Sequence, residues 1–438
     1  MQYSKTTQPI SFSFRKLIFS QMKRLQGGLV RLDDVAEGES YEFGDAASSL
    51  QTNITVHHTE AYKKIATGGN VGAAEAFMDG DWSSDNLTDV VRIFVRNLDS
   101  AHSIDATTSW LRRAFNRFLQ KLRANTVKGA KSNIAEHYDL GNDFYSLWLD
   151  QTMNYSCALF EQPGMSLADA STAKMDRACR QLDLKPGEHL LEIGTGWGGL
   201  AMHAATHFGC QVTSTTISDE QYNFARERVA EAGLQDQVTI LDHDYRDLEG
   251  RFDKLVSVEM IEAVGHEYLP TFFDCCGKLL KPDGMMLLQA IVIADQRYEF
   301  HRRSVDFVSK YIFPGGALPC ISKLTELSAR SGGFRMLDLL DIGPHYAETL
   351  KLWRHKFTEQ LPAVRELGFD ERFVRMWFYY LSYCEAAFIE RQINCVQMLL
   401  AKRQCRFDPI SDSSHNQSHF AGSRRSKGLS SQLAVNGN

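Results

Sequence analysis

A glycine-rich turn between an apolar segment and a helical segment constrains the fold of this chain more than any other feature. Residues 188–193 have the apolar character of a buried strand, and the sequence GTGWGG follows at 194–199. Glycines there let the backbone approach a ligand closely, and the helix predicted from Leu200 offers free N–H groups. A purely structural turn is the alternative, because the spacing is GxGxGG and not the GxGxxG of dinucleotide-binding proteins.

Strand and helix patterns alternate after this turn. Strands are predicted at 211–217, 238–241, 254–258 and 284–293, and a helix at 220–232. Strands that alternate with helices at this spacing form a doubly wound, mostly parallel sheet. The fold class is therefore α/β, and 438 residues allow roughly three domain-equivalents.

The chain divides into five predicted segments. Residues 1–28 form an amphipathic basic stretch, and residues 29–105 form a first compact region with a strand at 51–56 and a helical pattern near its end. Residues 106–131 form a basic linker helix, and residues 132–407 form the large α/β domain. Residues 408–438 are rich in Ser, Asn, Gln and Gly and are predicted to be disordered.

Composition excludes several classes of protein. The net charge of −6 argues against a nucleic-acid binder, and no apolar run reaches the roughly 20 residues that span a bilayer. Nine cysteines without a CxxC pair predict reduced thiols and no metal site. These features predict a cytoplasmic protein.

The net charge of −6 averages over a local basic run. Residues 106–131 carry seven basic residues and no acidic one, and their apolar residues repeat at helical spacing. This pattern is typical of a helix that lies on an anionic bilayer, although an interdomain helix with a solvated basic face would show it too. The predicted membrane contacts are Arg112, Arg113, Arg117, Lys121 and Arg123.

One acidic residue before the glycine turn indicates the ligand. Glu192 stands two positions before the first glycine, which is the pattern of S-adenosylmethionine sites. An NAD site would need an acidic residue at the end of the second strand, where this chain has Thr215 and Thr216. The loop therefore favours S-adenosylmethionine over NAD.

Six motifs occur in order along the chain. They are HYDLGNDFY at 137–145, MNYSCA at 153–158, LEIGTGWGGLA at 191–201, TIS at 216–218, VSVEMIEAVG at 256–265 and KYIFPGG at 310–316. Together they resemble the cyclopropane-fatty-acyl-phospholipid synthase family, from about residue 30 to 405. The resemblance implies a class I methyltransferase domain, a smaller N-terminal α+β domain that handles lipid, and a homodimer formed through the N-terminal region.

The resemblance also implies a reaction. The family transfers a methylene group from S-adenosylmethionine to a cis double bond of a phospholipid acyl chain, and a bound bicarbonate ion accepts the proton that is lost. The implied cofactor-binding residues are Tyr155, Ser156, Glu192, Gly194, Gly196, Thr216, Gln221, Tyr245 and Arg246. The substrate implies an enzyme that associates peripherally with the inner face of the membrane.

Five residues match the bicarbonate site of the family. They are Cys157 through its backbone amide, Glu262, Tyr346, Gln289, and Ile291 through its backbone amide. A buried thiol, a solvent carboxylate and a half-buried tyrosine are the plain structural alternatives for the first three. Glu259 stands where the family often has glycine and is set aside.

Gln289 replaces a histidine that many bacterial members carry, which leaves the product open. The first hypothesis is a cyclopropane synthase. The second is an enzyme that makes a methyl- or methylene-branched chain from the same cofactor and lipid. A catalytically inactive lipid-binding protein is a hypothesis of another class, and a methyltransferase for small soluble substrates is disfavoured by the acyl-chain and membrane features.

Overall fold

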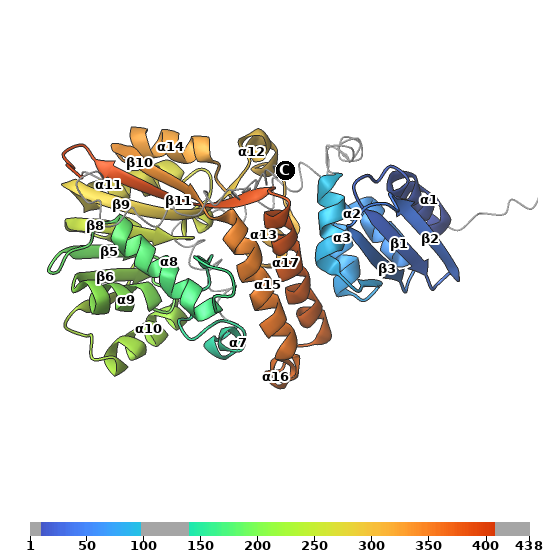
Figure 1. Cartoon of the computed structure of the whole chain (residues 1–438), viewed down its shortest axis with the longest axis horizontal. Helices are drawn as coiled ribbons and strands as arrows, with labels where there is room; N and C mark the ends of the chain where they lie inside the picture. The colour runs from blue at the N-terminus through green and yellow to red at the C-terminus, as the bar shows by residue number, and fades with distance from the viewer. Residues whose placement is uncertain (1–9, 98–139, 408–438) are drawn as a thin grey trace, which may run out of the picture.

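The computed structural model describes residues 10–97 and 140–407, which form two sheet-containing units (Figure 1). The basic run, its five predicted membrane contacts and the HYD sequence at 137–139 lie outside the described residues. Within the described ranges, no helix has both the length and the apolar character needed to cross a bilayer.

The N-terminal unit is a four-stranded sheet in the order β2-β1-β3-β4, covered by helices. Strands β1 and β3 pair in parallel and the other neighbours pair antiparallel. Helix α1 packs against α2, and Met22 at its end is buried in the same core as Val30 of β1. The elements are α1 (Ile10–Met22), β1 (Leu29–Asp34), β2 (Glu39–Gly44), β3 (Gln51–Val56), α2 (Glu60–Met78), β4 (Trp82–Ser84) and α3 (Leu87–Arg96).

Residues 140–407 form a seven-stranded sheet in the order β10-β11-β9-β8-β5-β6-β7. The strands are parallel except β11, which pairs antiparallel with both neighbours. This confirms the predicted doubly wound, mostly parallel sheet. The strands are β5 (His189–Ile193), β6 (Gln211–Thr216), β7 (Val238–Asp242), β8 (Phe252–Val258), β9 (Leu280–Ile293), β10 (Phe334–Asp341) and β11 (Ile393–Lys402).

Each face of this sheet has its own apolar core, because neighbouring strand residues point to opposite faces. Leu190 of β5 packs with α8 (Leu167–Gln181), α9 (Gly199–Phe208) and α10 (Asp219–Glu231). Leu191 packs on the other face with α11 (Leu269–Leu279) and α14 (Ile321–Arg330). The sheet is thus buried on both faces, as its nearly uninterrupted apolar strands require.

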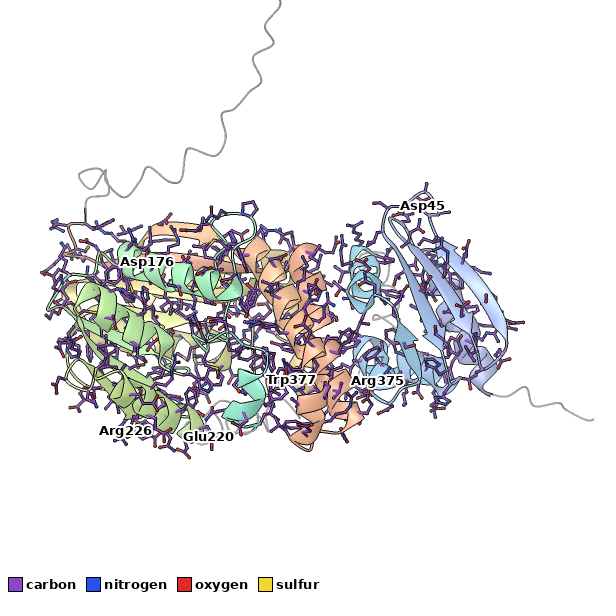
Figure 2. All side chains as sticks on the ribbon, turned by 60° about the horizontal axis from the view of Figure 1, so that its bottom comes forward. Asp45, Asp176, Glu220, Arg226, Arg375 and Trp377 are labelled. Atoms are coloured by element: carbon purple, nitrogen blue, oxygen red, sulfur yellow. The ribbon has the colours of Figure 1, made fainter. Side chains whose placement is uncertain are left out.

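Helices inserted late in the chain separate the two units (Figures 1 and 2). Helices α15 (Gly343–Glu359), α16 (Leu361–Glu366) and α17 (Glu371–Ile389) connect β10 to β11, and Trp148, Trp353 and Trp377 are fully buried among them and the short α7 (Asn142–Ser146). Two further short helices, α12 (Asp295–His301) and α13 (Phe307–Tyr311), follow β9.

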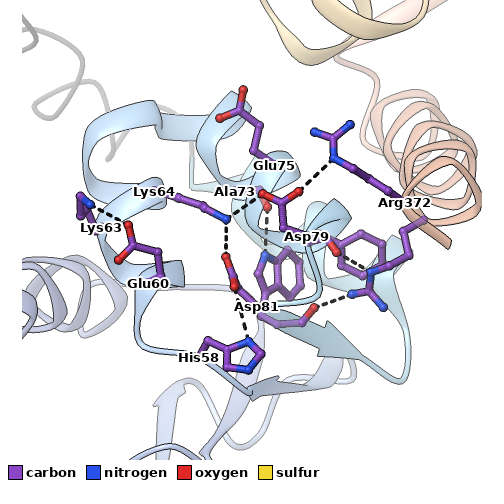
Figure 3. Close-up of polar contacts among 12 residues, drawn as sticks. His58, Glu60, Lys63, Lys64, Ala73, Glu75, Asp79, Asp81 and Arg372 are labelled. Carbon is purple, nitrogen blue, oxygen red and sulfur yellow. Dashed lines mark hydrogen bonds and ion pairs between the residues drawn. The ribbon is translucent and has the colours of Figure 1, made fainter. Parts of the chain in front are cut away.

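Helix α17 is joined to the N-terminal unit by charged groups (Figure 3). Arg372 lies 3.0 Å from Asp79, and Lys64 lies 2.7 Å from Asp79 and 2.6 Å from Asp81. Arg375 donates to the main-chain carbonyls of Phe77 and Trp82. Several of these groups are shielded from solvent, so the contact holds the N-terminal unit against the helices that wall the large domain.

Candidate active site

A cavity of about 430 Å³ opens at the carboxyl ends of β5, β6, β8 and β9, where ligands bind in open α/β sheets. It continues between α12, α13 and α17, and Asn70 and Val95 of the N-terminal unit form part of its wall. Every residue predicted for catalysis or cofactor binding lines this cavity, except Cys157 and Gln289. Those two lie directly behind the wall.

The glycine turn leaves room for a ligand. Gly194, Gly196 and Gly198 have φ of 101°, 52° and 84°, a region that favours glycine. A Cβ atom added to Gly196 would meet no protein atom within 4 Å, although this residue lines the cavity. The open space in front of Gly196 therefore belongs to the ligand site, and a purely structural turn does not explain it.

A buried carboxylate and a buried ammonium flank the turn. Burial raises the pKa of Glu192 to about 8, and the Ser214 hydroxyl donates to its carboxylate. Lys174 is 1% exposed, and its Nζ donates to Ser156 Oγ at 3.0 Å and to Asn154 Oδ1 at 3.2 Å. Burial lowers the pKa of Lys174. Sequence reasoning missed this lysine, because a single lysine in a helix carries no motif.

The other predicted cofactor residues are held in place by their own contacts. The Thr216 hydroxyl donates to Gln221 Oε1 at 3.0 Å, which leaves the Gln221 amide nitrogen as a donor. Arg246 is fixed by two bonds to Asp244, of 2.8 and 2.6 Å. The Tyr155 hydroxyl donates to that of Tyr380 at 3.0 Å, and its ring packs against those of Trp148 and Trp353.

These features fit S-adenosylmethionine, the cofactor that the resemblance implies. The turn lets a ligand reach the backbone at Gly196, and Glu192 lies buried in the wall beside it, where a cationic ligand would favour its charged form. Thr216 and Gln221 place polar groups at the end of the second strand of the motif, where ribose hydroxyls are bound in sites of this type.

Glu259, which sequence reasoning set aside, lies at the centre of a group of polar residues beside the cofactor turn. Its Oε1 accepts from the Cys157 backbone N–H at 3.0 Å and from Gln289 Nε2 at 2.8 Å. Its Oε2 accepts from the Tyr346 hydroxyl at 2.7 Å. Three residues predicted to hold an exogenous ion therefore bind the carboxylate of the protein itself.

The conformation of Glu259 shows why glycine is its alternative. Its φ is 50°, in the left-handed region, which costs a residue with a side chain about 1–2 kcal/mol. Such strain persists where the surroundings over-determine it, often at functional sites. The turn directs the carboxylate back toward Cys157 and Tyr346.

A buried relay fixes the orientation of Gln289. Its Oε1 accepts from Gln397 Nε2 at 2.9 Å, and Gln397 Oε1 accepts from Arg177 Nε at 2.9 Å. Because the carbonyl of Gln289 is occupied, its amide nitrogen must face Glu259. Gln397 could have been singled out in the sequence as a polar residue in an otherwise apolar strand.

Glu262 lies beside this group and has a different partner. Its Oε1 accepts from the Ile291 backbone N–H, and its buried Oε2 has no hydrogen-bond partner among the described residues. Burial, together with the charge of Glu259, raises the pKa of Glu262 to about 8. Glu262 is among the residues that line the ligand cavity.

The bicarbonate prediction therefore does not fit this arrangement. Four of the predicted donors, from Cys157, Gln289, Tyr346 and Ile291, are bonded to glutamate carboxylates. An anion placed among them would lie against the Glu259 carboxylate and find no free donor. The prediction considered the matching residues without the side chain at the glycine position.

Comparison with known proteins identifies a family that matches this chain. Residues 125–398 match the family model described as mycolic acid cyclopropane synthetase. The chain is 39% identical over 365 residues to the tuberculostearic acid methyltransferase UfaA1 of Mycobacterium tuberculosis, which covers 82% of this chain and 85% of that protein. It is 37% identical over 359 residues to the cyclopropane-fatty-acyl-phospholipid synthase of Escherichia coli, with 81% and 89% covered.

Solved structures match the large domain. The cyclopropane synthase MmaA2 of Mycobacterium tuberculosis matches with a TM-score of 0.59 and 32% identity, over 62% of this chain and 98% of that one. The mycolic acid cyclopropane synthase CmaA1, determined with SAH and CTAB, matches with a TM-score of 0.58 and 34% identity, over the same shares.

Proposed function

This chain belongs to the cyclopropane-fatty-acyl-phospholipid synthase family of S-adenosylmethionine-dependent methyltransferases, and from that premise we propose its reaction. It transfers a methylene group from S-adenosylmethionine to the cis double bond of an unsaturated phospholipid acyl chain and closes a cyclopropane ring. One observation carries the proposal: a single cavity joins the cofactor turn at Gly196 to the buried group around Glu259 and Tyr346.

The cofactor supplies the one-carbon unit as the methyl group of a sulfonium. The residues of the chain orient it: Gly194 and Gly196 allow close approach, while Thr216 and Gln221 provide polar anchors. Since an alkene is a poor nucleophile, holding it in line with that methyl group is the largest contribution available to the protein. The acyl chain occupies the remainder of the cavity, toward Val95 and Phe300.

Aromatic side chains in the cavity wall stabilise the positive charge that develops on the acyl chain. Tyr346 stacks on Phe388 with ring centroids 4.4 Å apart, and Tyr155 stacks on Phe313 at 6.3 Å. Aromatic faces attract cations without offering a nucleophile that would capture them. They also exclude water, which would convert the cation to an alcohol.

A branched product is the second candidate. Two relatives with 39% identity are named as methyltransferases acting on fatty acids and not as cyclopropane synthases, UfaA1 and a probable fatty acid methyltransferase of Pseudomonas putida. The same cation leads to either product, and ring closure is favoured when the base removes the proton from the added methyl group. The first candidate is preferred because Glu259 lies on the wall that also carries the glycine turn.

The decisive experiment incubates the full chain with S-adenosylmethionine and vesicles of unsaturated phospholipid, with saturated phospholipid as control. S-adenosylhomocysteine is expected only with the unsaturated lipid, and proton NMR of that lipid should show upfield ring signals. Vinylidene protons without ring signals would establish the branched product. No S-adenosylhomocysteine would leave the inactive lipid-binding protein as the explanation.

Glu262→Gln tests the site within the same assay. We expect turnover to fall by about 10²-fold or more, because the residue contributes a buried carboxyl group beside the reacting atoms. S-adenosylhomocysteine binding, measured by calorimetry, should stay within about twofold, since the substitution preserves volume. Wild-type turnover in this variant would contradict the role assigned to Glu262.

The N-terminal unit and the basic run complete the proposal. The N-terminal unit handles lipid, since Asn70 and Val95 line the cavity, and the family resemblance extends to a homodimer formed through this unit. Residues 106–131 bring the enzyme to the anionic inner face of the membrane. Binding to anionic vesicles should weaken as salt rises. Neutralising Arg112, Arg113 and Arg117 should abolish this binding, whereas neutralising Arg424, Arg425 and Lys427 should not.

A further inference from the structure

We propose that the Glu259 carboxylate is the proton acceptor of this reaction and takes the place of an exogenous anion. The inference rests on the proposed function. It assigns a catalytic residue where the family resemblance offers only a glycine, and it makes the enzyme independent of bicarbonate.

The first argument is the set of donors around Glu259. Donors come from a backbone amide, a side-chain amide and a phenol, and Cys395 Sγ adds a longer contact of 3.5 Å. All of these groups donate, and the Gln289 amide is held as a donor by its bond to Gln397. The two amides can only donate, so Oε1 is held as a hydrogen-bond acceptor, whereas the Tyr346 hydroxyl on Oε2 can donate or accept.

The second argument is the absence of a direct ion pair. No lysine or arginine within residues 10–97 and 140–407 makes an ion pair with Glu259. The charge of the buried Lys174 interacts with that of Glu259, but the two groups make no ion pair. A structural glutamate in a core would normally be paired, because burying an unpaired charge is costly.

The third argument is access. Oε1 accepts three of the four contacts, whereas Oε2 accepts only the Tyr346 hydroxyl. A carboxylate oxygen has two lone pairs, so Oε2 retains one. Glu259 lines the cavity together with Gly194 and Tyr346, so on this proposal Oε2 is the oxygen that the reacting groups reach.

The step balances without another reactant. The alkene forms a bond to the methyl carbon while the bond from that carbon to sulfur breaks, and a cation remains on the neighbouring alkene carbon. Glu259 Oε2 removes a proton from the added methyl group, and the released C–H electron pair closes the ring. The proton then leaves Glu259 for solvent, with S-adenosylhomocysteine and the cyclopropane as products.

The test compares Glu259→Gln and Glu259→Gly with the wild type in buffer freed of carbon dioxide, with and without added bicarbonate. Wild-type turnover on unsaturated vesicles should change less than about twofold on addition, whereas Glu259→Gln should lose about 10²- to 10⁴-fold in either buffer. Glu259→Gly should be equally slow alone and recover at least about tenfold with bicarbonate, because only glycine leaves space for the ion.

Binding of S-adenosylhomocysteine by calorimetry serves as the folding control for both variants, and Glu267→Gln is the matched control, since that glutamate is exposed in the same segment. Bicarbonate dependence of the wild type, or wild-type turnover in Glu259→Gln, would overturn the inference while leaving the proposed function intact. A wild type that forms no S-adenosylhomocysteine with any unsaturated lipid would overturn both.

Discussion

The role of the glycine turn is tested by adding one methyl group at Gly196 and comparing it with the same addition at Gly233. Both glycines have positive φ, 52° and 67°, and a Cβ on either would meet no protein atom within 4 Å. Gly196 lines the cavity, whereas Gly233 follows helix α10 and does not. Backbone strain is therefore matched, and only the position relative to the ligand differs.

The two variants should be equally destabilised. Forcing alanine into the left-handed region costs about 1–2 kcal/mol, and each kcal/mol lowers Tm by about 2–4 °C in a domain of this size. Only Gly196→Ala should lose affinity for S-adenosylhomocysteine. Overpacking a closely fitted contact costs about 1–3 kcal/mol, which corresponds to about 5- to 150-fold in Kd.

Calorimetry with S-adenosylhomocysteine measures the affinities, and thermal unfolding measures the matched strain. Equal Kd values for Gly196→Ala, Gly233→Ala and the wild type would refute the placement of the cofactor against this turn. A much lower Tm for Gly196→Ala than for Gly233→Ala would show that the strain is not matched and that the turn has a structural function.

Two further predictions concern stability. Arg375→Met removes charged hydrogen bonds to two carbonyls of the N-terminal unit and should lower the free energy of unfolding by about 1.5–3 kcal/mol. Arg365→Met, at an exposed ion pair, should change it by less than about 1 kcal/mol. Denaturant titration measures both values, and equal losses would contradict the role of Arg375 at the interface. Burial raises the pKa of Glu192 from 4.5 to about 8, so the folded apo protein binds that proton more tightly than the unfolded chain does and should lose stability as pH rises from about 5 to 8. Glu192→Gln should reduce the fall in Tm over that range, and an unchanged pH profile would argue against the buried carboxyl.

Much of the fold follows from the sequence because local pattern and global topology agree. The strands predicted at 211–217 and 238–241 end within one residue of β6 and β7, since apolar runs between turn signals define them. Strand β9 was predicted from 284 but begins at Leu280, because its first residues, Lys281 to Gly284, have no strand character of their own. Pairing with β8 and β11 extends it.

The site was predictable only where residues belong to motifs. Glu192, Gly194 and Gly196 lie at alternate positions of one short segment, and their chemistry can be derived from this spacing alone. The contacts of Lys174 and Gln397 depend on tertiary packing. No local pattern marks Lys174, and Gln397 stands out only as a polar residue in an apolar strand, which does not reveal its partners. The contacts of Glu259 could not be foreseen, because the direction of its side chain depends on one backbone angle.

The residues at positions 259 and 289 are best understood together. The family resemblance implies that glycine is often found at 259 and histidine at 289; this chain has Glu259 and Gln289, and their side chains are bonded at 2.8 Å. The carboxylate restores the single negative charge that an ion would bring, and the amide restores a donor to it. The double variant Glu259→Gly with Gln289→His should therefore exceed Glu259→Gly alone in bicarbonate-stimulated turnover, by about 10-fold if one charged hydrogen bond of about 1.5 kcal/mol is recovered. Gln289→His alone should be slow in any buffer, because the larger ring disturbs the bonds to Glu259 and Gln397. Additive effects in the double-mutant cycle would show that the two positions act independently and that their pairing is only structural.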